Sequence, residues 1–201
     1  MSTASPPRSV AVLDSAVAWT HSCLHRARTT PLSAPTPCSR WDLGQLLLHM
    51  EDSLVAIGEA AELGAVGVGA LPGQPDPHQL VDRITQRACA TQAAWRHRLT
   101  SAPIRVGDLD LGRDTLALVG ALEIAVHGWD VAQATGDRRP LPEDLAVRLY
   151  DVALAVTDPD ERGSRFGPPV PVPRRASTGT QLLALLGRHV RPDPPVDRPE
   201  T

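Results

Sequence analysis

The sequence predicts an all-α protein, a bundle of four long helices with additional helices toward the C-terminus. Apolar residues recur at helical spacing through several long segments. The connections between these segments are rich in proline and glycine, of which the chain has 20 and 15. Strand-like alternation occurs only in residues 104–114. The 201 residues, 42% of them hydrophobic, suit one domain, which we expect over residues 1–190, followed by a disordered tail over 191–201.

The first half of the chain reads as helices joined by proline-rich and glycine-rich connections. A helix is expected over residues 10–28, on one broad apolar face. After a connection containing Pro31, Pro35 and Pro37, Ser39 has the spacing of a capping box with Asp42, so a second helix is expected from there to about residue 63. The segment 64–77 is expected to be a mobile loop bordering a pocket.

The second half continues the helical pattern. A third helix is expected over residues 78–100, and residues 104–114 are expected to be irregular or weakly extended. A fourth helix should begin at Asp114 or Thr115 and end at Gly136, a typical C-terminal cap. Pro142 suits the first turn of a fifth helix, and a short helix over about 178–186 follows a proline-rich stretch over 158–175.

The composition excludes several classes of protein. A net charge of −3 argues against a basic nucleic-acid-binding surface. All 20 basic residues are arginine, so a Schiff-base lysine and a P-loop lysine are both excluded. No apolar run reaches 18 residues, so no membrane span is expected. The odd number of cysteines predicts no disulfide framework, and we expect a cytoplasmic protein in which Cys23, Cys38 and Cys89 serve in packing.

The fourth expected helix carries two ionisable residues in an apolar setting. Between Asp114 and Asp130 the only ionisable residues are Glu123 and His127. Residues four apart lie on one face of a helix, so these side chains should project side by side into the interior. A buried carboxylate must be paired or coordinated.

The second expected helix contributes a third residue of the same kind, because His49 follows three leucines. If His49 faces Glu123 and His127, two imidazoles and one carboxylate form a ligand set for zinc or another divalent ion, with a fourth position free. Asp52 and Asp130 each follow a histidine by three residues and are candidates to accept its second ring N–H. In the plainer interpretation Glu123 and His127 bind each other and His49 is a core histidine. Trp41, Trp95 and Trp129 are expected in the core or in a pocket wall.

Several motifs in the same order along residues 10 to 190 resemble a known family. These are Pro37-Cys38 before Trp41-x7-His49, Glu123-x3-His127-Gly-Trp-Asp130 before Ala134-Thr135-Gly136, Phe166-Gly-Pro-Pro-Val-Pro-Val-Pro, and Leu185-Leu-Gly-Arg188. The chain is similar to the metal-binding domain of mycothiol-dependent maleylpyruvate isomerase and its actinobacterial relatives, within the DinB-like superfamily. The resemblance implies a DinB-like four-helix bundle whose divalent metal is held by His49, Glu123 and His127. The isomerase carries a further C-terminal domain in its substrate site, and this sequence ends after the metal-binding part.

The resemblance implies an enzyme that uses a divalent metal, Zn²⁺ or else Ni²⁺ or Fe²⁺, and mycothiol as cosubstrate. A metal-held thiolate would add to a small electrophilic substrate, by S-transfer or by addition and elimination as in isomerisation. Two alternatives stay open: a thiol-independent metal-dependent hydrolase, lyase or cyclase, and a non-catalytic module whose metal has a fourth protein ligand such as His21, His25 or Asp130. The expected partners are a small-molecule substrate and, in a homodimer, a second copy of the chain, with no nucleic acid and no membrane. Arg162 and Arg165 lie in a stretch expected to shape the pocket rim.

Overall fold

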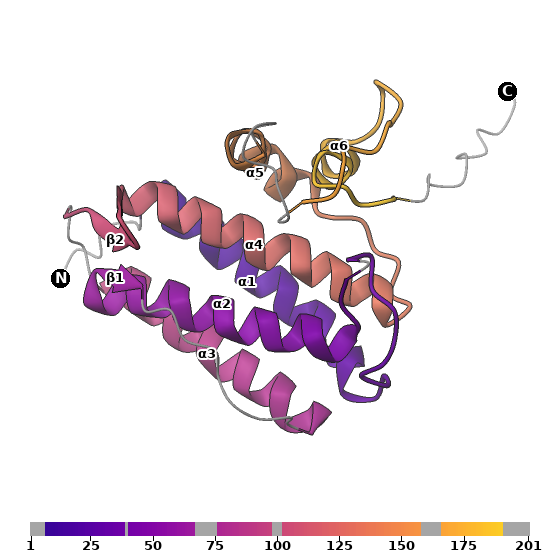
Figure 1. The fold of residues 1–201 in the computed structure, drawn as a ribbon, viewed down its shortest axis with the longest axis horizontal. Coiled ribbons are helices and arrows are strands. Elements are labelled where there is room, and N and C mark those ends of the chain that lie inside the picture. The colour runs from indigo at the N-terminus through magenta and orange to yellow at the C-terminus, as the bar shows by residue number, and fades with distance from the viewer. Residues whose placement is uncertain (1–6, 39, 67–75, 98–101, 158–165, 191–201) are drawn as a thin grey trace, which may run out of the picture.

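The computed structural model describes residues 7–38, 40–66, 76–97, 102–157 and 166–190. Helices account for most of them (Figure 1). In chain order the elements are α1 (Arg8–Leu24), the 3₁₀ helix η1 (His25–Arg28), α2 (Leu43–Leu63), β1 (Ala65–Val66), α3 (Pro77–His97), β2 (Ile104–Val106), β3 (Leu109–Leu111), α4 (Arg113–Ala134), α5 (Glu143–Val156) and α6 (Thr178–Leu185).

Four long helices form the bundle that the apolar spacing predicts. Helix α1 packs along α4, and α2 packs along α3 and also against α4. Helices α5 and α6 pack on each other, and α5 also contacts α4, so they lie on one flank of the bundle (Figure 1). This arrangement confirms a helical bundle with additional C-terminal helices.

Helix α4 is the central helix, and most of its residues are buried. It is long and apolar enough to span a membrane by length and composition alone, but 78% of its most apolar stretch is buried inside the bundle. Gly128 lets α1 approach closely, because a Cβ there would lie 2.9 Å from Thr20 Cβ. The Thr20 hydroxyl donates to the Ile124 carbonyl at 2.9 Å, which fixes α1 against the turn that precedes His127.

The start of α2 corrects one prediction. The N-cap is Asp42 and not Ser39, which lies outside the described residues. The Asp42 carboxylate accepts from the Gln45 backbone N–H at 2.9 Å, and the Gln45 side chain accepts from the Asp42 N–H at 3.1 Å. Both Ser39 and Asp42 are good capping residues, but only Asp42 is followed at the third position by a glutamine that completes the reciprocal pair.

A small three-stranded sheet of short strands, in the order β1-β2-β3, accompanies the predicted helical bundle. Strands β2 and β3 form an antiparallel hairpin within the segment expected to be irregular or weakly extended, and Gly107 in its turn has φ +58°. Strand β1 pairs parallel to β2, with Ala65 opposite Arg105. The alternation in residues 104–111 marked the hairpin, but two residues are too few to show β1 in a sequence.

The remaining elements follow the predictions closely. Gly136 has φ +75° directly after the C-cap of α4, and Pro142 is the N-cap residue of α5, one position before the helix. The loop predicted over 64–77 falls largely outside the described residues, as do Arg162, Arg165 and the tail over 191–201. The single-domain assignment stays a prediction.

Candidate metal centre

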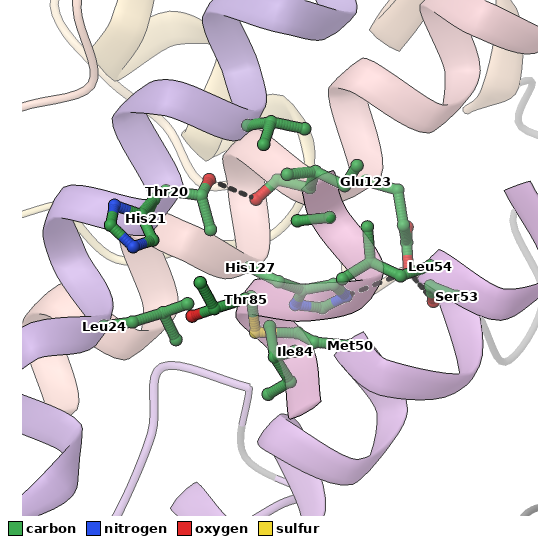
Figure 2. A pocket seen from close by; sticks show the side chains of 13 residues that line it. Thr20, His21, Leu24, Met50, Ser53, Leu54, Ile84, Thr85, Glu123 and His127 are labelled. Atoms are coloured by element: carbon green, nitrogen blue, oxygen red, sulfur yellow. Dashed lines mark hydrogen bonds and ion pairs between the residues drawn. The ribbon is translucent and has the colours of Figure 1, made fainter. Parts of the chain in front are cut away.

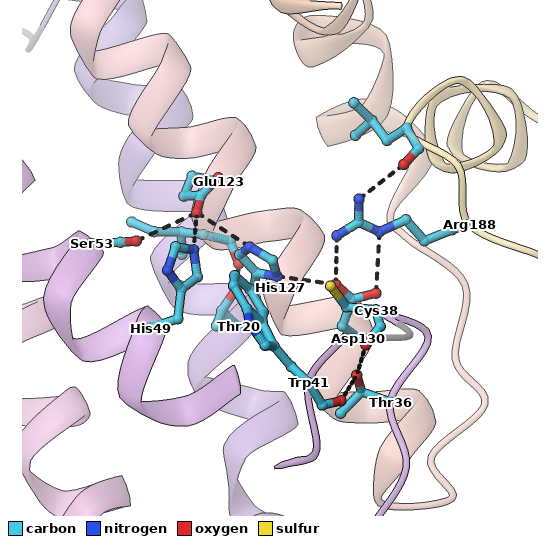
Figure 3. Close-up of polar contacts among 12 residues, drawn as sticks. Thr20, Thr36, Cys38, Trp41, His49, Ser53, Glu123, His127, Asp130 and Arg188 are labelled. Carbon is cyan, nitrogen blue, oxygen red and sulfur yellow. Dashed lines mark hydrogen bonds and ion pairs between the residues drawn. The ribbon is translucent and has the colours of Figure 1, made fainter. Parts of the chain in front are cut away.

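The three side chains singled out in the sequence meet between α2 and α4. One donor atom from each of His49, Glu123 and His127 lies within 4.8 Å of the others. Glu123 Oε1 is 2.7 Å from His49 Nε2 and 3.2 Å from His127 Nε2 (Figure 3). The Glu123 carboxylate thus lies between the imidazole of His49 on α2 and that of His127 on α4.

Helix geometry and an aromatic neighbour together set the directions of the two imidazoles. Glu123 and His127 are one turn apart on α4 and share a face. The Trp41 ring, from the connection before α2, lies 4.4 Å from the His49 ring and 5.8 Å from the His127 ring. The two imidazoles are edge-on to each other at 5.0 Å. Trp41 therefore packs against both imidazoles and restricts their rotation.

The two nitrogens of His127 both face carboxylates. Nδ1 lies 3.0 Å from Asp130 Oδ2, and Nε2 faces Glu123. Burial lowers the pKa of His127, but the attraction of Glu123 and Asp130 outweighs it and raises this pKa to about 9. Burial alone would raise the pKa of Glu123, but the pairing with His127 and His49 outweighs burial and holds this pKa well below its usual value. Both shifts have the same physical cause, since each charged side chain stabilises the charged form of the other, and together they favour an ionised Glu123 beside a protonated His127.

Asp130 is held from its other side by an arginine. Arg188 Nη2 donates to Asp130 Oδ2 at 2.8 Å, and Nε lies 3.4 Å from Oδ1. Asp130 Oδ2 thus lies within hydrogen-bond distance of His127 Nδ1, as the predicted contact between Asp130 and a ring nitrogen requires. Asp52 is not among the hydrogen-bond partners that the described residues offer to His49, whose Nε2 faces Glu123.

A cavity of about 380 Å³ opens above the three donor atoms. Trp41 and Phe166 form part of its wall, together with apolar side chains of α4 and α5, and Arg188 and Cys38 also border it. A second, much smaller void of about 20 Å³ lies on the other side of Glu123 and His127, among α1, α2 and α3 (Figure 2). The larger cavity gives a small molecule room to approach the donor group, and the smaller one holds no more than a water.

The tryptophans and cysteines considered in the sequence lie in the core, at the cavity or on the surface. Trp95 and Trp129 are buried in the core, and Trp41 is the pocket-wall aromatic. Cys23 is buried, and burial raises its pKa to about 11, as expected of a packing residue. The packing role predicted for Cys89 is wrong, because Cys89 is exposed, and Cys38 is half-buried at the cavity.

Sequence reasoning placed no role on Arg188 or Phe166, which both border the cavity. Arg188 follows Gly187 at the end of a short apolar helix, a signal of a helix end that carries no information on what the arginine contacts. The contact between Trp41 and the imidazoles depends on how the connection before α2 folds back, which local spacing does not specify.

Comparison with known proteins identifies one family. The chain is 30% identical over 180 residues to the uncharacterized protein Rv0738 of Mycobacterium tuberculosis strain H37Rv, covering 84% of this chain and 91% of the relative. The same values hold for the uncharacterized protein MT0763 of strain CDC 1551. No family model matches the chain. No solved structure matches it either. The chain therefore belongs to the same family as the Mycobacterium tuberculosis protein Rv0738.

Proposed function

We propose that this protein is a divalent-metal-dependent enzyme that acts with a low-molecular-weight thiol, mycothiol in the family that its motifs resemble. It transfers the thiol to a small electrophilic substrate, or isomerises the substrate by thiol addition and elimination. The observation that carries the proposal is the group of three donor atoms at the floor of a cavity large enough for a small molecule.

The donor set fits a zinc-like ion. Two imidazole nitrogens and a carboxylate oxygen are the ligands that catalytic zinc sites use, and about 3.3 Å separates neighbouring donors around a tetrahedral zinc ion. Glu123 Oε1 lies 3.2 Å from His127 Nε2, close to that spacing, and 2.7 Å from His49 Nε2, a hydrogen-bond distance that would have to widen around an ion. His49, Glu123 and His127 would hold the ion. A divalent ion with an open position favours the thiolate over the thiol near neutral pH.

The protein's own residues supply orientation and exclusion of water. Asp130 accepts from His127 Nδ1, which leaves Nε2 directed at the donor group. Trp41 covers one side of both imidazoles, and Phe166 adds an apolar wall to the cavity. An apolar wall beside the reacting atoms lowers the local dielectric and strengthens the electrostatic interactions within the cavity.

The ligand count supports an open site over a closed structural one. Structural zinc sites are usually completed by four protein ligands. In the described part of the chain, the donor group has three members. Of the predicted fourth ligands, Asp130 is engaged by Arg188, and His21 and His25 are exposed side chains of α1 and η1.

The test combines metal binding with thiol conjugation. The chelator-treated protein is titrated with Zn²⁺, and the loaded protein is assayed with mycothiol and 1-chloro-2,4-dinitrobenzene as the electrophile. We expect one Zn²⁺ per chain and conjugation that depends on both metal and thiol. A chain that binds no Zn²⁺, or whose metal-free form conjugates equally fast, contradicts the proposal. Turnover of small esters or lactones without thiol would instead support the thiol-independent alternative.

A further inference from the structure

We propose that Arg188 is a positioning residue of the metal centre, which acts through Asp130 to hold His127 with Nε2 facing Glu123 and His49. The inference rests on the proposed function, because it concerns the site that would hold the metal. Its consequence is that the segment after α6, distant in sequence from α2 and α4, sets the geometry of the donor group.

A continuous chain of contacts connects the arginine to the donor group (Figure 3). Asp130 Oδ2 accepts from Arg188 Nη2 at 2.8 Å and faces His127 Nδ1 at 3.0 Å. The same imidazole presents Nε2 to Glu123 at 3.2 Å. The side chain of Asp130 is 0% exposed and that of Arg188 is 8% exposed, so water does not substitute for these contacts.

The backbone delivers Arg188 to this position through the end of α6. The N–H of Gly187 donates to the Ala184 carbonyl at 3.0 Å, and the N–H of Arg188 donates to the Leu183 carbonyl at 2.9 Å. This pair of bonds, with Gly187 at φ +83°, is a Schellman motif that turns the chain back toward the bundle. A Cβ on Gly187 would lie 2.9 Å from the Gly167 Cα, so the turn also requires glycine for space.

The arginine side chain itself is anchored at more than one point. Besides its two contacts with Asp130, Arg188 Nη1 donates to the Leu186 carbonyl at 3.0 Å. A guanidinium held in this way contacts both carboxylate oxygens and fixes the plane of the carboxylate. Without Arg188, the Asp130 carboxylate can rotate about its side-chain bonds. His127 then loses the fixed acceptor that sets its ring orientation and selects the tautomer whose Nε2 is free to bind a cation.

The experiment measures Zn²⁺ affinity by calorimetry for the wild-type chain, Arg188→Met, Arg188→Lys and Arg83→Met. Arg83 makes an ion pair of 2.6 Å with Glu51, whose side chain is 1% exposed. Its described ion pair is with Glu51 and not with the His127 network, so Arg83→Met controls for the loss of an arginine from a buried carboxylate. We expect Arg188→Met to weaken Zn²⁺ binding about 10-fold or more. Arg188→Lys should restore part of the loss, and Arg83→Met should bind as the wild type does.

A spectroscopic readout separates positioning from a general loss of stability. Nitrogen-15 NMR of the histidine rings, assigned with His127→Ala, should show the wild-type His127 bound to Zn²⁺ through Nε2 with a proton on Nδ1. In Arg188→Met we expect this signal to be lost or split between tautomers. If Arg188→Met does not fold, Arg188→Lys carries the test, because a single ammonium cannot reproduce both contacts with Asp130.

Two outcomes overturn the inference and point to different causes. If the wild-type chain binds Zn²⁺ and a folded Arg188→Met binds it within twofold and with an unchanged His127 signal, Arg188 does not position the histidine, and the proposed function is unaffected. If the wild-type chain binds no Zn²⁺, the proposed function fails and this inference fails with it.

Discussion

Replacing Glu123 by glutamine tests the donor group with the smallest change of shape. The amide keeps the volume of the side chain and removes its negative charge. Glu123 Oε1 lies between His49 Nε2 and His127 Nε2, so the change removes the anionic member of the group and leaves two neutral or protonated imidazoles. We therefore expect Zn²⁺ affinity to fall strongly while helical content stays unchanged.

The size of the loss follows from electrostatics. Two unit charges 4 Å apart contribute about 4 kcal/mol at an effective dielectric constant of about 20. A divalent ion within this donor group lies no farther than 4.8 Å from the carboxylate and carries two charges, so about 4 kcal/mol is a lower bound on the loss. A loss of about 4 kcal/mol or more corresponds to an affinity at least roughly 1,000-fold weaker.

The assay is competition for Zn²⁺ against a chromophoric chelator, with circular dichroism to verify folding. Glu62→Gln serves as the matched control, because Glu62 lies on the exposed face of α2. We expect the control to match the wild type. A folded Glu123→Gln protein that retains Zn²⁺ within about tenfold of the wild-type affinity would refute the assignment of Glu123 as a ligand.

Three further predictions concern pH and packing. The raised pKa of His127, about 9, means that the metal-free site is protonated at pH 7. Binding of Zn²⁺ at that pH should therefore release about one proton, measured by calorimetry in buffers of different ionisation enthalpy, and proton release near zero is inconsistent with His127 as a ligand. Burial raises the pKa of Glu51, but Arg83 and Arg87 outweigh it and lower this pKa below its ordinary 4.5. The stabilisation by Glu51 should therefore be complete above pH 4.5 and should be lost as the pH falls through the lowered pKa. In urea titrations the free energy of unfolding of Glu51→Gln should fall less steeply with acid than that of the wild type. Equal slopes for the two proteins would contradict this prediction. Gly128→Ala should lower the free energy of unfolding by about 1–3 kcal/mol, because the new Cβ would meet Thr20. Gly58→Ala is the control and should lower it less, because its Cβ would lie 3.3 Å from Thr91 Oγ1. Equal losses in the two variants would contradict the close approach of α1 at Gly128.

The long helices were predictable because each carries a sustained apolar pattern between strong breaking signals. Helix α4 ends within two residues of the predicted Gly136, which takes the left-handed conformation that favours glycine. The cap of α2 was misplaced because Ser39 and Asp42 both suit the role locally. Strand β1 was missed because a two-residue strand has no period of its own and depends on its distant partner β2.

The donor residues were predictable for a different reason, since ionisable side chains in apolar helices demand a partner. That argument identified His49, Glu123 and His127, and the i,i+3 spacing identified Asp130. The sequence placed Trp41 in the core or in a pocket wall, but it predicted neither the contact of Trp41 with both imidazoles nor a role for Arg188, because both side chains reach the site by tertiary folding of irregular segments. Contacts of this kind are set by where a chain turns back on the bundle, and no local periodicity encodes them.

Anomalous diffraction at the zinc edge, from crystals grown with Zn²⁺, tests the central claim most directly. We predict one peak per chain, within bonding distance of His49 Nε2, Glu123 and His127 Nε2, with Asp130 still on Arg188 and the remaining coordination position facing the cavity. An ion bound elsewhere, or one closed by a fourth protein side chain, would contradict the account of an open catalytic site.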